Sequence, residues 1–148
     1  MEPYRLHASL GYKLSIAARL QERRLDEGLK ALGLTRTTWC VLLGLGNEGL
    51  TQPSDIARFI GIDRTATSRA LRQMEAAGLL ERQTGDGDRR TTRVTLSPKG
   101  ADLIKAGTPM AMANNEAMRS RLTETEYKRL VALLEKVITE ENPDLSAL

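Results

Sequence analysis

The stretch TQPSDIARFIGIDRTATSRALRQMEAAGLLERQTGDGDRRTTRVTL, residues 51–96, decides how the rest of the chain can fold. Its first part predicts a short helix with one apolar face. Thr51 is placed to cap this helix, and Pro53 suits its first turn, where a missing N–H costs nothing. Gly61 suits the left-handed residue that ends a helix.

A second helix follows directly, because Asp63 can cap its start and Gly78 can end it. Apolar or small residues recur at the helical spacing and predict an inward face, formed by Thr67, Ala70, Leu71 and Met74. Residues 79–84 and 91–96 alternate apolar and polar, as the strands of a half-buried hairpin do. This order of elements predicts a winged helix-turn-helix in a mainly α (α+β) fold.

The opposite face of the second helix suggests a function, and it carries Arg64, Thr65, Ser68, Arg69, Arg72 and Gln73. Arginine can bond guanine edges or phosphates, glutamine can pair with adenine, and the hydroxyls can bond either. An ordinary solvated face can have the same composition. The adjoining turn and hairpin favour DNA binding, and they extend the predicted DNA-binding set to Asp88, Arg89, Arg90 and Arg93.

Length and charge agree with this interpretation. A chain of 148 residues is long enough for one domain with a buried core. The formal net charge is 22 minus 19, or +3, which is weak evidence for nucleic acid. The distribution is more informative, because residues 51–96 contain eight arginines and no lysine. Arginine is the residue of planar, bidentate recognition.

Cysteine content and hydropathy predict the compartment. Cys40 is the single cysteine, so an intrachain disulfide is impossible and a reducing cytoplasm fits best. The N-terminal residues have no apolar core of a signal peptide, and no apolar run approaches the length of a membrane span. A buried small hydrophobe is favoured over a redox sensor for Cys40, because there is no second cysteine and no obvious cationic neighbour.

Helices are predicted on both sides of this central stretch. Residues 6–32 read as one long amphipathic helix closed by Gly33, and residues 35–46 as a buried helix capped by Thr35. Ser97 and Pro98 begin a helix toward Arg121 that Gly107 and Pro109 are expected to bend. A capping box, Thr123 with Glu126, begins the last helix, and Asn142-Pro143 is expected to end it.

The apolar rows of the first and last helices are too long for one small winged domain to cover. We therefore expect a second copy to cover them, so the chain is predicted to be an obligate dimer. The predicted dimerisation residues are Leu6, Leu10, Leu14, Tyr127, Leu130, Leu134, Val137 and Ile138.

Two other classes of function compete with this interpretation. Gly44, Gly46 and Gly49 form a literal GxGxxG, the pattern of a dinucleotide-binding enzyme, with Asp63 about where a ribose-binding acid would lie. No βαβ unit surrounds these glycines, and no catalytic or metal-ligating pattern occurs elsewhere, so neither an enzyme nor a cofactor is expected. A winged helix that only binds proteins would carry an apolar recognition face, and the arginines argue against one.

The sequence resembles the MarR family of bacterial winged-helix transcription regulators. The resemblance is densest at GLLER and DRRTTRVTLSPKG, where Asp88, Arg90 and Leu96 fit the family's wing pattern and Ser97 replaces its threonine. It continues through LGLTRTTWCVLLGL (residues 32–45) and RLTETEYKRLVALLEKV (residues 121–137), so that it covers nearly the whole chain.

This resemblance implies a homodimer in which residues 1–34 and 98–148 form the dimerisation helices and residues 35–97 the DNA-binding lobe. It implies a ligand-responsive regulator, most often a repressor, that places two recognition helices on a pseudo-palindromic operator. A phenolic or other aromatic, lipophilic effector would bind between these parts. Tyr12, Trp39 and Met110 are weak candidates for lining that site, because aromatic residues and methionine at helical spacing more often belong to a plain core. The operator, the effector, the regulated genes and the direction of regulation are left open.

Overall fold

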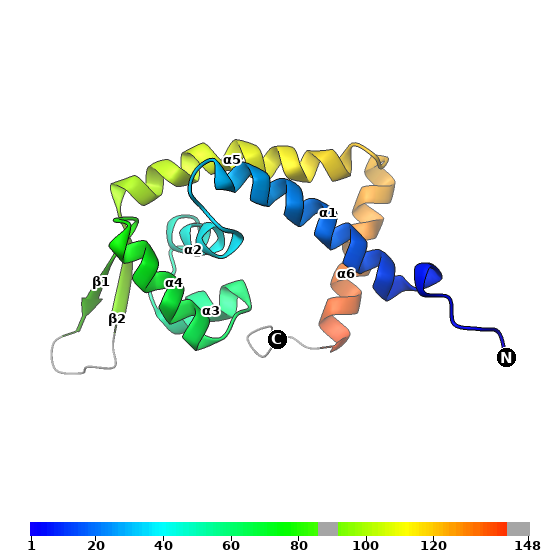
Figure 1. Cartoon of the computed structure of the whole chain (residues 1–148), viewed down its shortest axis with the longest axis horizontal. Coiled ribbons are helices and arrows are strands. Elements are labelled where there is room, and N and C mark those ends of the chain that lie inside the picture. Colours follow the sequence, from blue (N-terminus) through cyan, green and yellow to red (C-terminus); the bar gives the residue numbers. More distant parts are fainter. Residues whose placement is uncertain (86–91, 142–148) are drawn as a thin grey trace.

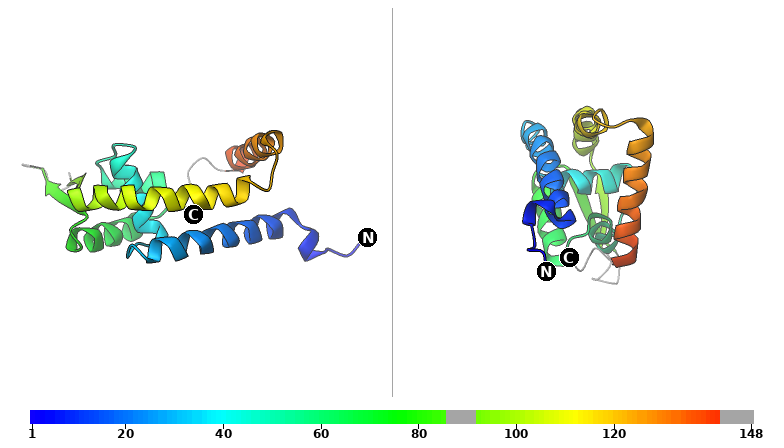
Figure 2. Two further views of the ribbon diagram at one scale, coloured as in Figure 1. Left: turned by 90° about the horizontal axis from the view of Figure 1, so that it is seen from above. Right: turned by 90° about the vertical axis from the view of Figure 1, so that its right-hand side faces the viewer.

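A computed structural model describes residues 1–85 and 92–141. The elements follow in the order η1 (Leu6–Ala8), α1 (Leu10–Lys30), α2 (Arg36–Gly46), α3 (Pro53–Ile60), α4 (Arg64–Ala76), β1 (Leu80–Thr84), β2 (Thr92–Leu96), α5 (Pro98–Arg119) and α6 (Glu124–Glu141). Helices α2, α3 and α4 and the two strands form a lobe, while α1 and α5 run side by side away from it (Figure 1). Helix α6 lies at the far end of α5 (Figures 1 and 2). The predicted winged helix-turn-helix is confirmed.

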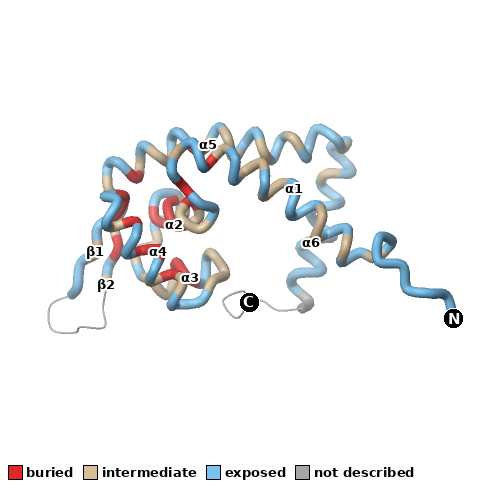
Figure 3. Tube along the Cα trace, in the orientation of Figure 1, coloured by how far each residue is buried: buried red, intermediate tan, exposed pale blue. Residues whose placement is uncertain are grey.

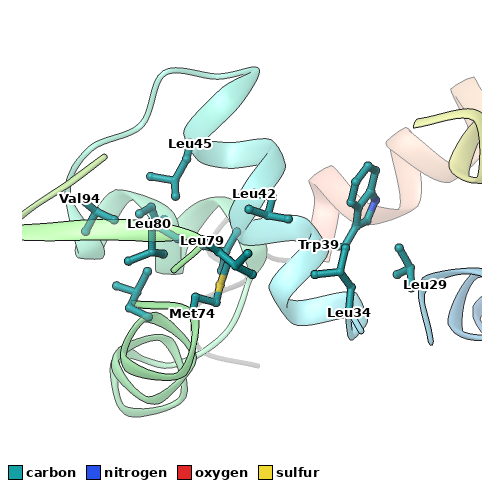
Figure 4. Packing of buried hydrophobic residues seen from close by; sticks show 12 residues of the cluster. Leu29, Leu34, Trp39, Leu42, Leu45, Met74, Leu79, Leu80 and Val94 are labelled. Atoms are coloured by element: carbon teal, nitrogen blue, oxygen red, sulfur yellow. The ribbon is translucent and has the colours of Figure 1, made fainter. Parts of the chain in front are cut away.

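The core lies inside the lobe. Leu42, Leu45, Met74, Leu80 and Val94 gather between α2, α4 and the hairpin, as Figure 4 shows. Leu29, Leu34 and Trp39 continue this core toward α1. The predicted inward face of α4 is confirmed, since its four residues are buried and the Thr67 hydroxyl donates to the carbonyl of Asp63 at 2.9 Å.

Most predicted helix ends are confirmed. Asp63 Oδ1 accepts a hydrogen bond from the Ala66 N–H at 2.7 Å, and Gly61 and Gly78 are left-handed with φ of 77° and 73°. Thr51 does not cap α3, so that prediction was wrong, because Gln52 precedes Pro53 and takes the N-cap position. The Thr51 carbonyl instead accepts a hydrogen bond from the Val94 N–H at 2.8 Å, which ties the start of α3 to β2.

The first helix is shorter than predicted. Residues 6–8 form a separate 3-10 turn, and α1 begins only after Ser9, whose Oγ accepts a hydrogen bond from the Tyr12 N–H at 3.3 Å. A serine hydroxyl favours a helix start over a helix interior, which explains the break. Helix α5 is continuous from Pro98 to Arg119, so Gly107 and Pro109 do not interrupt it.

The GxGxxG pattern is not a nucleotide loop. Gly44 and Gly46 lie inside helix α2, whereas the dinucleotide motif requires a turn between a strand and a helix. A Cβ on Gly46 would overlap Cδ1 of Ile104, and one on Gly44 would lie 3.2 Å from the ring of Phe59. The dinucleotide alternative is therefore wrong, because these two glycines allow α3 and α5 to pack closely on α2.

Gly107 makes a close contact between α5 and the lobe. A Cβ at this position would lie 2.5 Å from Cζ3 of Trp39, whose indole is buried beneath α5. Because the indole is enclosed, we expect Gly107→Ala to lower the free energy of unfolding by about 1–3 kcal/mol. Urea denaturation monitored by Trp39 fluorescence measures the change.

Gly11→Ala is the matched control, since a Cβ on Gly11 in α1 would meet nothing within 4 Å. It is expected to change the free energy of unfolding by less than about 0.5 kcal/mol, because Gly11 is exposed in the first turn of α1. Equal changes in the two variants would contradict the close packing of Gly107.

Among the described residues, no helix is long and apolar enough to cross a membrane.

Candidate DNA-binding site

The exposed face of α4 presents the predicted polar side chains together. Arg64, Thr65, Arg69, Arg72 and Gln73 are exposed and Ser68 is half-buried. All of these except Gln73 line one shallow hollow of about 350 Å³. The Arg72 Nη2 donates to the Ser68 Oγ at 3.2 Å, which restrains that guanidinium along the helix. Two hydroxyls and three guanidinium groups are thus presented on one helical surface.

Acidic groups near this face are already engaged. Glu75 is the one acidic residue of α4. Its Oε2 accepts a hydrogen bond from Nε of Arg82 in β1 at 2.8 Å and lies 2.7 Å from Nη2 of the same guanidinium in an ion pair. The Arg82 guanidinium holds the pKa of Glu75 below its usual range, so this carboxylate stays ionised and paired at neutral pH. Asp63 is used in capping the helix. The α4 face is therefore basic, a property suited to phosphate and base contacts.

A second groove lies next to this face, and the sequence did not predict it. We name it the α3–hairpin groove. Its volume is about 480 Å³, and its lining is Gln52, Pro53, Ser54, Arg64, Ser68, Leu71, Arg82 and Thr92. Several separate elements and the linker before α3 contribute these residues, so no local spacing could have grouped them. In the sequence, nothing distinguishes Arg82 from the other seven arginines of residues 51–96.

The wing is only partly described. Arg93 lies on β2, is exposed, and stands opposite Gln83 of β1 in the antiparallel register. Asp88, Arg89 and Arg90 lie outside the described residues, and their roles remain predictions.

The predicted dimerisation rows are open to solvent in the single chain. Leu6, Leu10, Leu14, Leu130, Val137 and Ile138 are exposed, and Tyr127 and Leu134 are half-buried. Figure 3 shows the contrast between the buried lobe and the exposed outer helices. Exposed apolar side chains gathered along helices are typical of an interaction surface.

The outer helices enclose an apolar groove. Its volume is about 560 Å³, and α1, α5, α6 and the α5–α6 connection line it with Ala17, Leu20, Arg23, Arg24, Glu27, Met118, Arg121, Leu122 and Leu130. The corner between α5 and α6 is held by an Arg119–Glu124 ion pair at 2.7 Å, and Arg119 also lies 5.1 Å from the Tyr127 ring centroid. Hydrogen bonding from Arg119 lowers the pKa of Glu124.

The three candidate effector residues are not brought together within one chain. Trp39 is buried in the core, and Met110, one turn after Gly107, packs on Gly28 of α1. Tyr12 instead stacks on His7 with ring centroids 4.6 Å apart. Tyr12 and Gly28 are both in α1, and the sixteen-residue step between them spans about 24 Å at the helical rise.

Cys40 is half-buried in α2. Burial raises the pKa of its thiol, and the nearby Arg36 opposes this to a smaller degree. A cationic neighbour is thus present, contrary to the expectation from the sequence. Arg36 is itself engaged by two carboxylates of α1, Glu22 at 2.7 Å and Asp26 at 2.8 Å. Among residues 1–85 and 92–141, no three His, Cys, Asp or Glu side chains gather as metal ligands would.

We expect Cys40→Ser to leave the response of DNA binding to peroxide unchanged. A raised pKa keeps the thiol protonated near neutral pH, and the thiolate is the form that peroxide oxidises. The measurement is DNA affinity before and after peroxide treatment of both proteins. Release of the wild type but not of the variant would make Cys40 a redox sensor.

Comparison with known proteins agrees with this geometry. The MarR family model matches residues 32–91. BpsR of Bordetella bronchiseptica is 25% identical with a TM-score of 0.80, over 86% of this chain and 97% of that one. A cysteine-to-serine mutant of MarR from E. coli, solved with operator DNA, is 25% identical with a TM-score of 0.78, over 86% and 92%. A probable transcriptional regulator from Pseudomonas aeruginosa is 27% identical with a TM-score of 0.80, over 90% and 99%.

A lobe of this fold with a basic second helix defines a winged helix-turn-helix regulator of transcription that binds DNA. Its helical ends and its matches are more specific. The chain is similar to the MarR family of regulators, whose model matches residues 32–91.

Proposed function

We propose that the protein is a homodimeric, ligand-responsive repressor that binds a pseudo-palindromic operator. The basic face of α4 carries this proposal, because Arg64, Arg69 and Arg72 stand exposed while Glu75 is paired with Arg82. Such a face suits the major groove, where arginine reads guanine and hydroxyls bond bases or phosphates. A solved structure supports DNA as the partner of this face, since the similar E. coli MarR mutant was solved with operator DNA.

A dimer follows from the exposed apolar rows of α1 and α6. When a second copy covers them, two α4 helices become parts of one assembly. Two-fold dimers of this kind bind half-sites about 34–36 Å apart, one helical turn of DNA. The domain division at residues 34 and 98 follows the same logic, with the outer helices joining two lobes.

The effector is proposed to act on the spacing between these lobes. A ligand that binds one spacing more tightly shifts the population toward it and so changes DNA affinity. Regulation of DNA binding by 6-hydroxynicotinic acid in BpsR supports a small aromatic ligand. Trp39 and Met110 lie where α5 crosses the lobe. Tyr12 of the same chain is too far along α1 to join them, so a Tyr12 side chain at this site would have to come from the second copy.

Selection of bound sequences from a random duplex pool tests the proposal. We expect an enriched site with two inverted half-sites whose centres lie about 10 base pairs apart. Enrichment of a single unrepeated half-site would contradict the dimeric operator. Absence of any binding to duplex DNA at about 50 mM salt would instead favour a winged helix that binds proteins.

A further inference from the structure

We propose that the α3–hairpin groove binds a phosphodiester of the DNA backbone, with Arg82 as the residue that fixes the recognition helix against it. This inference rests on the proposed DNA-binding function and adds a site to it. Residues at the start of α3, on the side of α4 and on both strands of the hairpin line the groove, so a bound phosphate would touch all three elements.

The lining has the chemistry of an anion site. Among the described residues, no carboxylate lines the groove. The polar groups that line it are two guanidinium groups, three hydroxyls and one amide, from Arg64, Arg82, Ser54, Ser68, Thr92 and Gln52. Ser54 also belongs to the first turn of α3, where Pro53 has no N–H and the Asp55 N–H donates to the Gln52 carbonyl at 3.1 Å, so the turn can offer a ligand the Ser54 N–H. Arginine suits phosphate because its planar fork can bond two oxygens at once.

The Arg82 side chain is restrained by its ion pair with Glu75. The Glu75 Oε2 accepts a hydrogen bond from Nε of Arg82 and forms an ion pair with its Nη2, so the guanidinium keeps further N–H donors for a ligand. Its side chain is 31% exposed, which leaves it accessible to a ligand while the pair restrains it. A guanidinium with its conformation already restrained loses less entropy when it binds a phosphate.

The α3–hairpin groove and the shallow hollow on the exposed face of α4 have two lining residues in common. Arg64 and Ser68 line both of them, so a phosphate in the groove would lie directly beside the surface that carries Arg69 and Arg72. Contacts to phosphates set the register of a protein on DNA, and contacts to bases specify the sequence. Because Arg64 and Ser68 line both surfaces, one contact to the DNA backbone can position the α4 face over the bases.

Arg82→Gln tests the assignment through the salt dependence of DNA affinity. Each lost phosphate contact lowers the slope of log affinity against log salt by about 0.9, so a dimer should lose about 1.8. The ratio of wild-type to variant affinity should then shrink about tenfold between about 50 and 200 mM salt. Discrimination between the operator and random duplex should stay unchanged, because a phosphate carries no sequence information.

Two further variants separate charge from structure. Arg82→Lys keeps the charge and should restore most of the slope, whereas damage to the hairpin would lower affinity by one factor at every salt concentration. Lys105→Gln is the control, since Lys105 also has a carboxylate partner, Asp102 at 3.7 Å, but lies on α5 outside the groove. Its slope should match the wild type.

Outcomes for the two levels of the proposal are distinct. If the wild type binds DNA and Arg82→Gln has the slope of Lys105→Gln, the groove is not a phosphate site. If the wild type shows no salt-dependent DNA affinity at all, the proposed DNA-binding function itself fails.

Discussion

Leu130→Glu combined with Val137→Glu is expected to turn the protein into a monomer and to lower its affinity for a full operator by about 10²–10⁴-fold. Both side chains are exposed on the apolar row of α6, where a buried carboxylate would face a second copy. A monomer loses the second half-site, and with it the gain from tethering two recognition helices. Sedimentation and operator titration measure the two effects.

Lys136→Glu is the control for this pair, because Lys136 lies away from the Leu130–Val137 row of the same helix by its spacing. Neither Leu130 nor Val137 belongs to the lobe core, so both variants should keep the lobe folded. Removal of residues 1–20 should act like the α6 pair by deleting the exposed row of α1. A full-length protein that sediments as a monomer at micromolar concentration yet binds its operator with normal affinity would contradict the dimer.

Arg69→Ala is expected to weaken binding to the best operator by about 1–3 kcal/mol, if the guanidinium pairs with a base. It should also relax the base preference at one position of each half-site. Arg69 is exposed and lies on the hollow with Thr65, Ser68 and Arg72, so it can reach a base edge. In a dimer the loss occurs twice and should roughly double if the halves are independent. Titration over single-base variants of the operator identifies the relaxed position.

Arg90→Ala is expected to act differently, because the family resemblance places Arg90 on the wing. Binding should weaken for all sequences, and discrimination should be lost only for A·T content at the flanks, where the minor groove is read by its width. The salt slope should fall by about one unit for each arginine removed. If Arg90→Ala altered preference within the half-site and Arg69→Ala acted uniformly, the two roles would be reversed.

Arg129→Ala serves both arginine experiments as a control for the loss of one surface charge. It lies on α6, is exposed, and belongs to neither the α4 face nor the α3–hairpin groove. Its operator preference and salt slope should match those of the wild type.

The sequence by itself determined the elements and most of their ends. Asp63, Gly61 and Gly78 act on their immediate neighbours, through a capping carboxylate and left-handed glycines, and the structure confirms all three. The Thr123–Glu126 capping box is confirmed as well, by mutual hydrogen bonds at 2.8 and 3.2 Å. These signals extend over at most four residues, so the chain around them settles their conformation.

Only the tertiary structure decided which distant residues meet. The Thr51 carbonyl bonds β2, Gly107 lies against Trp39, and Arg82 pairs with Glu75 across the turn between α4 and β1. None of these contacts follows from periodicity, because each depends on how separate elements pack on the shared core. The α3–hairpin groove has the same origin: its arginines belong to a helix and a strand that become neighbours only when Met74, Leu80 and Val94 bury together.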